Sequence, residues 1–338
     1  LCGDGLSADL LFEGGEEVGE GGYVFSTPGI HRNVALLDVA SMHPTSIECL
    51  NMFGPYTQQF SDLKAARIAI KHGELDRAKT MLGGALAPYL DDETSTNALA
   101  YALKIVINSV YGLTAAPFDN AFRDPRNVDN ICAKRGALFM IDLKHFVQEK
   151  GFTVAHIKTD SIKIPNATPE IISEVMEFGT RYGYTFEHEA TYDRMCLFND
   201  AVYIAHDGKG WHATGAQFLH PYVFKTLLSH EEIVFDDYCE TKSVTTAIYL
   251  GDHDLDPDTY QFVGRVGRFV PVKEGGLDIL REKDGRYSFV SGTKGYKWRQ
   301  AEELQGDVGL VDDACARSLV DKAIDAIKEF GDPEELLS

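Results

Sequence analysis

The sequence predicts a mixed α/β fold of the α+β type, with room for two or three subdomains. Its 338 residues, 44% of them hydrophobic, are enough to bury a large core. Long stretches with apolar residues at helical spacing are separated by short segments in which apolar and polar residues alternate. Several of the short segments follow one another directly, which is typical of antiparallel strands.

Each element follows from a local pattern. The apolar run 34–40 is typical of a buried strand, and it carries Asp38 to an edge of the core. The cluster Asp-Glu-Thr-Ser at 92–95 supplies the N-cap of a helix at 95–111. The other expected elements are helices at 60–82, 131–151 (ended by Gly151), 169–182 and 313–330, strands at 153–158, 161–165, 184–192, 196–206 and 209–218, and glycine-punctuated strands within 260–298.

The formal net charge of −20 is unusual for a protein that binds a polyanion. The acidic residues are concentrated at 13–22 and 251–260, whereas basic residues gather at 63–71, 133–136 and 292–299. Local basic stripes still allow nucleic-acid binding, with marked salt sensitivity.

Membrane and metal-cluster classes are not supported by the sequence. No apolar run is long enough to cross a bilayer and no signal segment is present, so we expect a cytoplasmic protein with no membrane partner. The six cysteines show neither CxxC nor Cys/His spacing, which argues against a structural zinc site or a disulfide framework.

Three segments carry candidate chemistry. In the first, Asp38 at a strand end is followed by a serine and a proline, although such an acid is often only a cap or a surface group. In the second, Lys104, Asn108 and Tyr111 share one helix face. The lysine could neutralise a phosphate, the asparagine could donate hydrogen bonds, and the tyrosine could pack against a base or sugar. A solvated lysine and a half-buried tyrosine explain that stripe equally well. In the third, a two-residue hairpin tip within HIKTDSIKIP presents Asp160, as many plain turns present an acid.

Taken in this order, the patterns Asp-x-x-Ser-x-x-Pro-x-Ser, Lys-x-x-x-Asn-Ser-x-Tyr-Gly and Thr-Asp-Ser resemble the three polymerase motifs of family B DNA polymerases, particularly those of bacteriophages. The motifs cover about 30–215, and 218–229 and 262–276 are more weakly similar. The resemblance implies a right-hand architecture with an antiparallel-sheet palm, helical fingers and a mixed thumb. Its expected parts are 1–55 (N-terminal segment and first part of the palm), 56–113 (fingers), 114–215 (second part of the palm) and 216–338 (thumb), without an exonuclease domain.

The activity implied by the resemblance is template-directed addition of dNTPs to a primer 3′-hydroxyl, with release of pyrophosphate, in phage or viral DNA replication within a host cytoplasm. Asp38 and Asp160 match the catalytic carboxylates that hold two Mg²⁺ ions, with Mn²⁺ as an alternative and the backbone of Val39 as a further ligand. The expected partners are primer–template DNA, dNTPs and other replisome proteins.

The remaining binding residues also come from the resemblance. Arg67, Lys71 and Lys104 would close a cationic clamp on the triphosphate. The other residues expected to bind the dNTP are Asn108, Tyr111, Ser41, Met42 and His43, and those expected to contact DNA are Lys158, Tyr203, Lys294, Lys297 and Arg299.

Three positions depart from the family pattern. Lys158 replaces the first acid of the usual Asp-Thr-Asp-Ser hairpin, and its charge would lower the pKa of Asp160 or contact phosphate. His43 replaces a tyrosine that excludes the ribose 2′-hydroxyl, and Ala201 replaces a lysine that touches the primer. A catalytically retired palm that acts as a DNA-binding replisome subunit is therefore the main alternative, and a two-metal nuclease is another.

Overall fold

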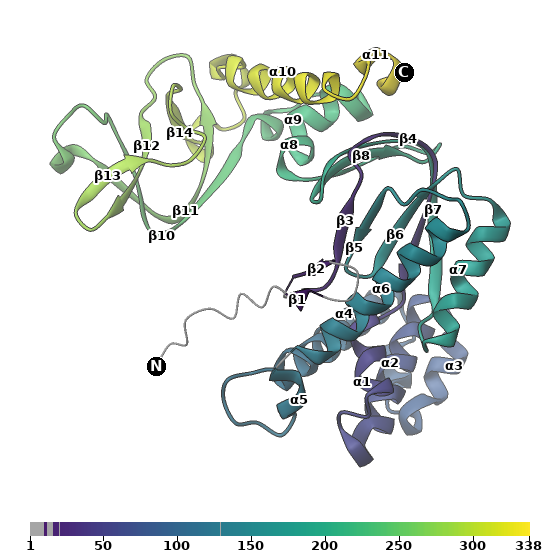
Figure 1. Ribbon diagram of the computed structural model, residues 1–338. Helices are drawn as coiled ribbons and strands as arrows, with labels where there is room; N and C mark the ends of the chain where they lie inside the picture. The colour runs from purple at the N-terminus through teal and green to yellow at the C-terminus, as the bar shows by residue number, and fades with distance from the viewer. Residues whose placement is uncertain (1–9, 12–15, 20, 129) are drawn as a thin grey trace. The chain divides into compact units, whose positions relative to one another are not determined.

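The computed structural model describes residues 10–11, 16–19, 21–128 and 130–338 (Figure 1). The chain divides into two compact units, Leu1–Asp193 and Arg194–Ser338. Both units combine helices with antiparallel sheets, so the predicted α+β class is confirmed. Residues 13–15 and 20 of the acidic stretch at 13–22 lie outside the described residues.

The first unit is built on an antiparallel sheet whose strand order is β3-β5-β6-β4-β7. Its strands are β3 (Val24–Ser26), β4 (Gly29–Val39), β5 (His156–Lys158), β6 (Ser161–Pro165) and the first part of β7 (Phe186–Asn199). A separate short pair, β1 (Leu10–Leu11) and β2 (Glu17–Val18), precedes it.

The predicted hairpin between β5 and β6 is confirmed, with a two-residue tip at Thr159 and Asp160. Thr159 adopts a left-handed conformation with φ of 55°, which closes the tight turn. The tip is held against the end of β4, because the Val39 amide donates a hydrogen bond of 2.8 Å to the Asp160 carbonyl oxygen. Asp38 is paired with Ser161 across β4 and β6, so the two candidate acids lie on adjacent strands.

Side-chain alternation along β4 separates a buried face from the face that carries Asp38. Ala35, Leu37 and Val39 point into the core, where they pack with apolar residues of β6 and of two long helices. Those helices are α6 (Ile131–Glu149) and α7 (Pro169–Arg181), and Figure 1 shows them lying over the sheet. One face is therefore closed by helices.

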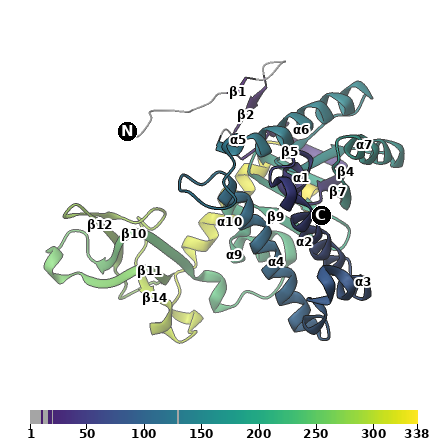
Figure 2. The same ribbon diagram turned by 90° about the horizontal axis from the view of Figure 1, so that it is seen from below.

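The helices between β4 and α6 form a second layer of the first unit (Figure 2). The predicted helix at 60–82 is interrupted, because Gly73 takes a positive φ of 75° between α2 and α3. Apolar residues of α2 and α4, including Ala66, Ala69 and Leu103, pack into one cluster. The elements are α1 (Met42–Cys49), α2 (Thr57–Lys71), α3 (Leu75–Thr80), α4 (Glu93–Thr114), the short α5 (Pro125–Val128) and the short helices η1 (Gly54–Tyr56), η2 (Met81–Gly84) and η3 (Ala87–Tyr89).

The second unit contains the end of β7, which pairs with β8 (Val202–His206), and β8 in turn pairs with β9 (Trp211–Thr214). The single strand expected at 196–206 is thus two strands, because the Asn199 side chain accepts hydrogen bonds from the amides of Ala201 and Val202 and forms a turn. The strand expected at 209–218 is also shorter, since a helix begins at Ala216.

A five-stranded antiparallel sheet follows, with strand order β13-β12-β10-β11-β14. Its inner face packs Ile248, Leu250, Phe269 and the fully buried Trp298. The strands are β10 (Glu240–Gly251), β11 (Gln261–Pro271), β12 (Asp278–Lys283), β13 (Arg286–Phe289) and β14 (Trp298–Gln300). The helices of this unit are α8 (Ala216–Leu219), α9 (Pro221–Phe224), α10 (Ala314–Lys328), α11 (Pro333–Leu337) and the short η4 (Lys225–Ser229), η5 (Phe235–Tyr238), η6 (Pro257–Thr259), η7 (Ala301–Leu304) and η8 (Val308–Leu310).

Within the described ranges, no helix has both the length and the apolar character needed to cross a membrane.

Candidate functional site

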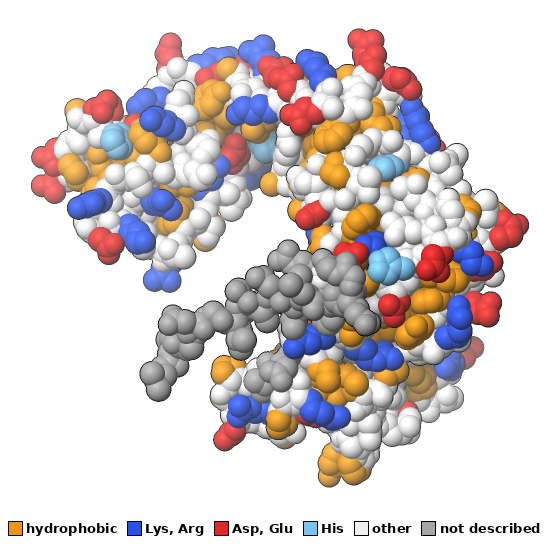
Figure 3. Space-filling model, viewed as in Figure 1, with side chains coloured by type: hydrophobic (Ala, Val, Ile, Leu, Met, Phe, Trp, Pro, Cys, Tyr) orange, Lys and Arg blue, Asp and Glu red, His pale blue; other side chains and the backbone are white. Residues whose placement is uncertain are grey.

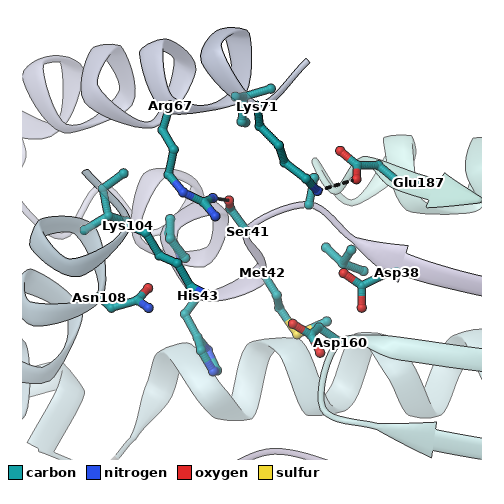
Figure 4. Close-up of a pocket in the computed structure, with 15 residues that line it drawn as sticks. Asp38, Ser41, Met42, His43, Arg67, Lys71, Lys104, Asn108, Asp160 and Glu187 are labelled. Carbon is teal, nitrogen blue, oxygen red and sulfur yellow. Dashed lines mark hydrogen bonds and ion pairs between the residues drawn. The ribbon is translucent and has the colours of Figure 1, made fainter. Parts of the chain in front are cut away.

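A cavity of about 350 Å³ in the first unit gathers most of the predicted site residues (Figure 4). Its walls come from the end of β4, the start of α1, one face each of α2 and α4, the β5–β6 hairpin and β7. Its lining residues are Asp38, Val39, Ala40, Ser41, Met42, His43, Pro44, Arg67, Ile68, Lys71, Lys104, Ile107, Asn108, Asp160 and Glu187.

Asp38 and Asp160 form the acidic floor of this cavity. The strand pairing and the tight hairpin tip bring them together from positions 122 residues apart (160 − 38). Burial raises the pKa of Asp38 to about 7, and the negative charges of Asp160, Glu189 and Glu187 add to this effect. Burial also raises the pKa of Asp160. The two carboxylates are therefore costly to ionise together unless a positive charge joins them.

Lys163 supplies a buried positive charge close to these acids. Its side chain is 3% exposed, and its Nζ lies 3.3 Å from Nδ1 of the equally buried His156. Burial lowers the pKa of Lys163 to about 8, against the opposing effect of Asp38. The positive charge of Lys163 partly offsets the rise that burial causes in the pKa of Asp160, a role in which we expected Lys158. The available signal was a lysine inside the apolar strand SIKIP.

Lys158 itself lies at the end of β5, where its side chain is exposed. It is paired with Ser161 of β6 and with Val24 of β3. Its predicted contact with phosphate stays a prediction.

The opposite wall of the cavity carries three basic residues. Arg67 and Lys71 are one turn apart on α2, and Lys104 projects from α4 (Figure 4). Arg67 donates a hydrogen bond of 3.4 Å to the Ser41 hydroxyl. Ser41 precedes α1 and adopts a left-handed conformation with φ of 59°. The structure therefore brings together the three cations that the sequence predicted.

Glu187 is a cavity residue that sequence reasoning missed. It accepts a hydrogen bond of 2.8 Å from Lys71, and His72 Nε2 lies 3.0 Å from its other oxygen. The hydrogen bond from Lys71 is the main reason why the pKa of Glu187 is lowered. The alternation of acids at Glu187 and Glu189 in the predicted strand 184–192 was the available signal.

His43 and Tyr111 form a stacked pair beside the cavity. Their rings are 4.5 Å apart between centroids and nearly parallel, at 3°. Burial lowers the pKa of His43, so its imidazole is neutral near pH 7. His43 lines the cavity together with Asn108, whereas Tyr111 stands behind it and contacts the site through the histidine ring.

The donor set fits a hard divalent cation. Two carboxylates would gain from a shared Mg²⁺, because its charge would offset both the burial that mainly raises the pKa of Asp38 and the repulsion from Asp160 that adds to it. Among the residues described, no group of three or more His, Cys, Asp and Glu is placed to hold a metal ion. Further oxygen ligands would have to come from the backbone, from water or from a substrate.

The other predicted DNA contacts belong to the second unit. Lys297 lies 3.1 Å from Asp278, Arg299 lies 2.9 Å from Glu303, and Lys294 stands 5.7 Å above the Phe289 ring. Tyr203 is half-buried in β8, where its amide donates to the Thr214 hydroxyl. Their binding to DNA stays a prediction.

Comparison with solved structures shows a distant likeness. No protein-family model matches the sequence, and no curated protein is similar to it. Among solved structures, the chain is similar to the family B DNA polymerase from the hyperthermophilic archaeon Pyrobaculum calidifontis, with 14% sequence identity and a TM-score of 0.49. The alignment covers 90% of this chain and 46% of that polymerase, so the chain spans about half of its length.

Proposed function

We propose that this chain is the polymerase portion of a template-directed DNA polymerase that adds dNTPs to a primer 3′-hydroxyl. One observation carries the proposal: Asp38 and Asp160 meet on the floor of a cavity whose opposite wall presents Arg67, Lys71 and Lys104. A nuclease needs the acids alone, whereas a triphosphate substrate also needs the cations. Phage or viral replication as the setting, and replisome proteins as partners, extend the same proposal.

Each wall has its own task in this proposal. Lys104, Arg67 and Lys71 would bind the triphosphate oxygens, and Lys71 would exchange its contact with Glu187 for one with phosphate. Asp38 and Asp160 would hold Mg²⁺, joined by the backbone of Val39. When bound, such ions stabilise the attacking and leaving oxygens of an in-line displacement at phosphorus. Asn108, Ser41 and Met42 would border the substrate, and His43 would lie against its sugar.

Primer extension on a recessed DNA template, at low salt with Mg²⁺ and dNTPs, tests this function. We expect products that follow the template sequence and that require Mg²⁺. DNA binding without any extension would contradict the proposal and favour the retired palm, whereas degradation of the primer would favour the nuclease.

Mg²⁺ is expected to stabilise the protein more at pH 8 than at pH 6. The pKa of Asp38 is raised from 3.8 to about 7, so the folded protein binds this proton more tightly than the unfolded chain does. The resulting gain in the free energy of unfolding is fully present below about pH 4 and is lost as the pH rises through 7. Mg²⁺ binds the ionised form, whose population falls about tenfold between pH 8 and pH 6. Thermal unfolding at a fixed Mg²⁺ concentration, at both pH values, measures this difference. In Asp38→Asn the pH dependence should disappear, and an equal Mg²⁺ effect at both pH values in the unaltered protein would contradict the assignment.

His43→Tyr is expected to increase discrimination against ribonucleotides. A larger ring at this position, stacked on Tyr111, would fill space beside the sugar and clash with a 2′-hydroxyl. The ratio of kcat/KM for a dNTP to that for the matching NTP should rise by about tenfold, which corresponds to about 1.4 kcal/mol. His43→Gln, which stays smaller than tyrosine, is the matched control, and an unchanged ratio in His43→Tyr would place the sugar elsewhere.

A further inference from the structure

The outer face of the five-stranded sheet in the second unit carries a row of aromatic rings. Phe262, Tyr249, Tyr287 and Tyr260 meet edge to face in this order, with centroid distances of 5.5, 5.3 and 5.0 Å. Strand pairing explains the row, because Tyr249 lies opposite Phe262 of β11 and the neighbouring strands add the other rings. We refer to these four residues as the aromatic row.

The aromatic row does not belong to the core of the unit. The core lies on the other face of the sheet, where Ile248 and Leu250 pack around Trp298. In contrast, the Phe262 side chain is 64% exposed, and two apolar side chains near it in sequence, Val266 and Leu255, are 59% and 60% exposed. An exposed ring that continues a row of half-buried rings is a feature of surfaces that bind a partner.

An acidic loop borders the aromatic row. Residues 252–258 contain Asp252, Asp254, Asp256 and Asp258, and Figure 3 shows acidic and apolar side chains next to one another on the second unit. The Tyr260 hydroxyl, 3.3 Å from the His253 carbonyl oxygen and 3.2 Å from that of Leu255, can donate to either. The Tyr260 ring also lies directly over Gly251, where any side chain would collide with it. Tyr260 thus fastens the acidic loop to the aromatic row.

Few cations balance this loop. Lys297 lies 3.9 Å from Asp252, and His253 lies 3.7 Å from Asp254. Over the described part of the chain, no Lys or Arg forms an ion pair with Asp256, Asp258 or Glu282. After burial itself, the negative charges of Asp252, Asp278, Asp254 and Asp256 contribute to raising the pKa of Tyr260. The surface therefore combines the exposed Phe262 ring and three half-buried tyrosine rings with carboxylates that no lysine or arginine among the described residues pairs.

We propose that the aromatic row and the acidic loop form a docking surface for a segment of a partner protein that bears arginine or lysine beside apolar residues. Charge complementarity selects this occupant. A guanidinium or ammonium group gains both from the ring faces and from the carboxylates. A single-stranded nucleic acid would stack on the rings, but its phosphates would meet the acidic loop. The surface belongs to the second unit, whereas the cavity at Asp38 and Asp160 belongs to the first.

Fluorescence anisotropy with a labelled twelve-residue peptide of alternating arginine and leucine tests the proposal on the full chain. We expect saturable binding that is weakened by salt, and about tenfold weaker binding for Phe262→Ala, because this variant removes the exposed ring that a bound peptide would bury. The triple variant Asp254→Asn, Asp256→Asn, Asp258→Asn should weaken binding severalfold, because asparagine preserves the local backbone hydrogen bonds and removes only charge. Leu310→Ala, which removes another exposed apolar side chain outside the aromatic row, is the control and should bind normally.

Three results would overturn the proposal. The first is no binding of the arginine peptide, or equal binding of a peptide in which glutamate replaces arginine. The second is tighter binding of a twelve-nucleotide oligo-dT than of the arginine peptide, with that binding lost in Phe262→Ala. This result would show that the aromatic row binds nucleic acid. The third is a dimer in sedimentation velocity that Phe262→Ala disperses, which would make a second copy the occupant. Primer extension by Phe262→Ala should remain unchanged, so failure of this proposal and failure of the polymerase proposal can be told apart.

Discussion

Asp160→Asn is expected to reduce Mg²⁺-dependent primer extension by about 10²- to 10⁴-fold, because a metal-held carboxylate contributes several kcal/mol and each 1.36 kcal/mol is tenfold in rate. Asparagine keeps the size of the side chain and tolerates the hairpin tip. The hydrogen bond from Val39 to the carbonyl oxygen of residue 160 involves only backbone and stays in place. Loss of extension in this variant would therefore reflect the lost charge.

The control for this variant is Ser161→Ala, which alters the next residue of the same hairpin. The Ser161 hydroxyl makes only a long hydrogen bond of 3.4 Å to the Lys158 carbonyl oxygen, so we expect nearly full activity. The melting temperature of Asp160→Asn without Mg²⁺ should equal or exceed that of the unaltered protein, because one of two repelling carboxylates is gone. Retention of more than a tenth of the activity would remove Asp160 from the catalytic centre.

Lys104→Ala is expected to raise the KM for dNTPs by about 10- to 100-fold, since a charge-assisted hydrogen bond contributes about 1.5–3 kcal/mol. Lys104 lines the cavity, and among the described residues it forms no ion pair, so its charge is available to a phosphate. Its removal should leave the fold intact, because the side chain is exposed on α4. Steady-state primer extension at varied dNTP concentrations measures the effect.

Lys79→Ala is the matched control for Lys104→Ala. Lys79 lies on α3, outside the cavity, and forms an exposed ion pair of 3.0 Å with Asp91. Loss of this pair should cost at most about 1 kcal/mol of stability and leave the KM unchanged. A KM for Lys104→Ala within twofold of the unaltered value would show that the triphosphate does not lie against α4.

Local sequence patterns predicted those parts of the site that a single element can specify. The stripe of Lys104, Asn108 and Tyr111 lies on one confirmed helix. Its N-cap is Asp92, whose side chain accepts a hydrogen bond from the Ser95 amide. The hairpin around Asp160 was recognisable because two short apolar strands leave only a two-residue connection. Periodicity and turn chemistry depend on neighbours in the chain, so they can be read directly.

The elements that were missed depend on packing. Helix α1 was not predicted, because Pro44 follows the strand closely and proline commonly turns the chain. The structure places Pro44 in the first turn of α1, where proline is tolerated. Strand β10 was missed because much of it is polar, and it is stabilised by pairing on both sides with β11 and β12. In both cases long-range contacts decide the conformation of an ambiguous segment.

By itself, the sequence determined the α+β class and the hairpin tip. It also indicated two candidate acids, at 38 and 160, and three candidate cations, at 67, 71 and 104. Only the tertiary structure decided that these side chains share one cavity, that Glu187 holds Lys71 and that Lys163 is buried near the acids. The physical reason is that charge interactions and desolvation depend on distance and burial in space. Strands far apart in the chain set both quantities, and no local pattern records which strands will become neighbours.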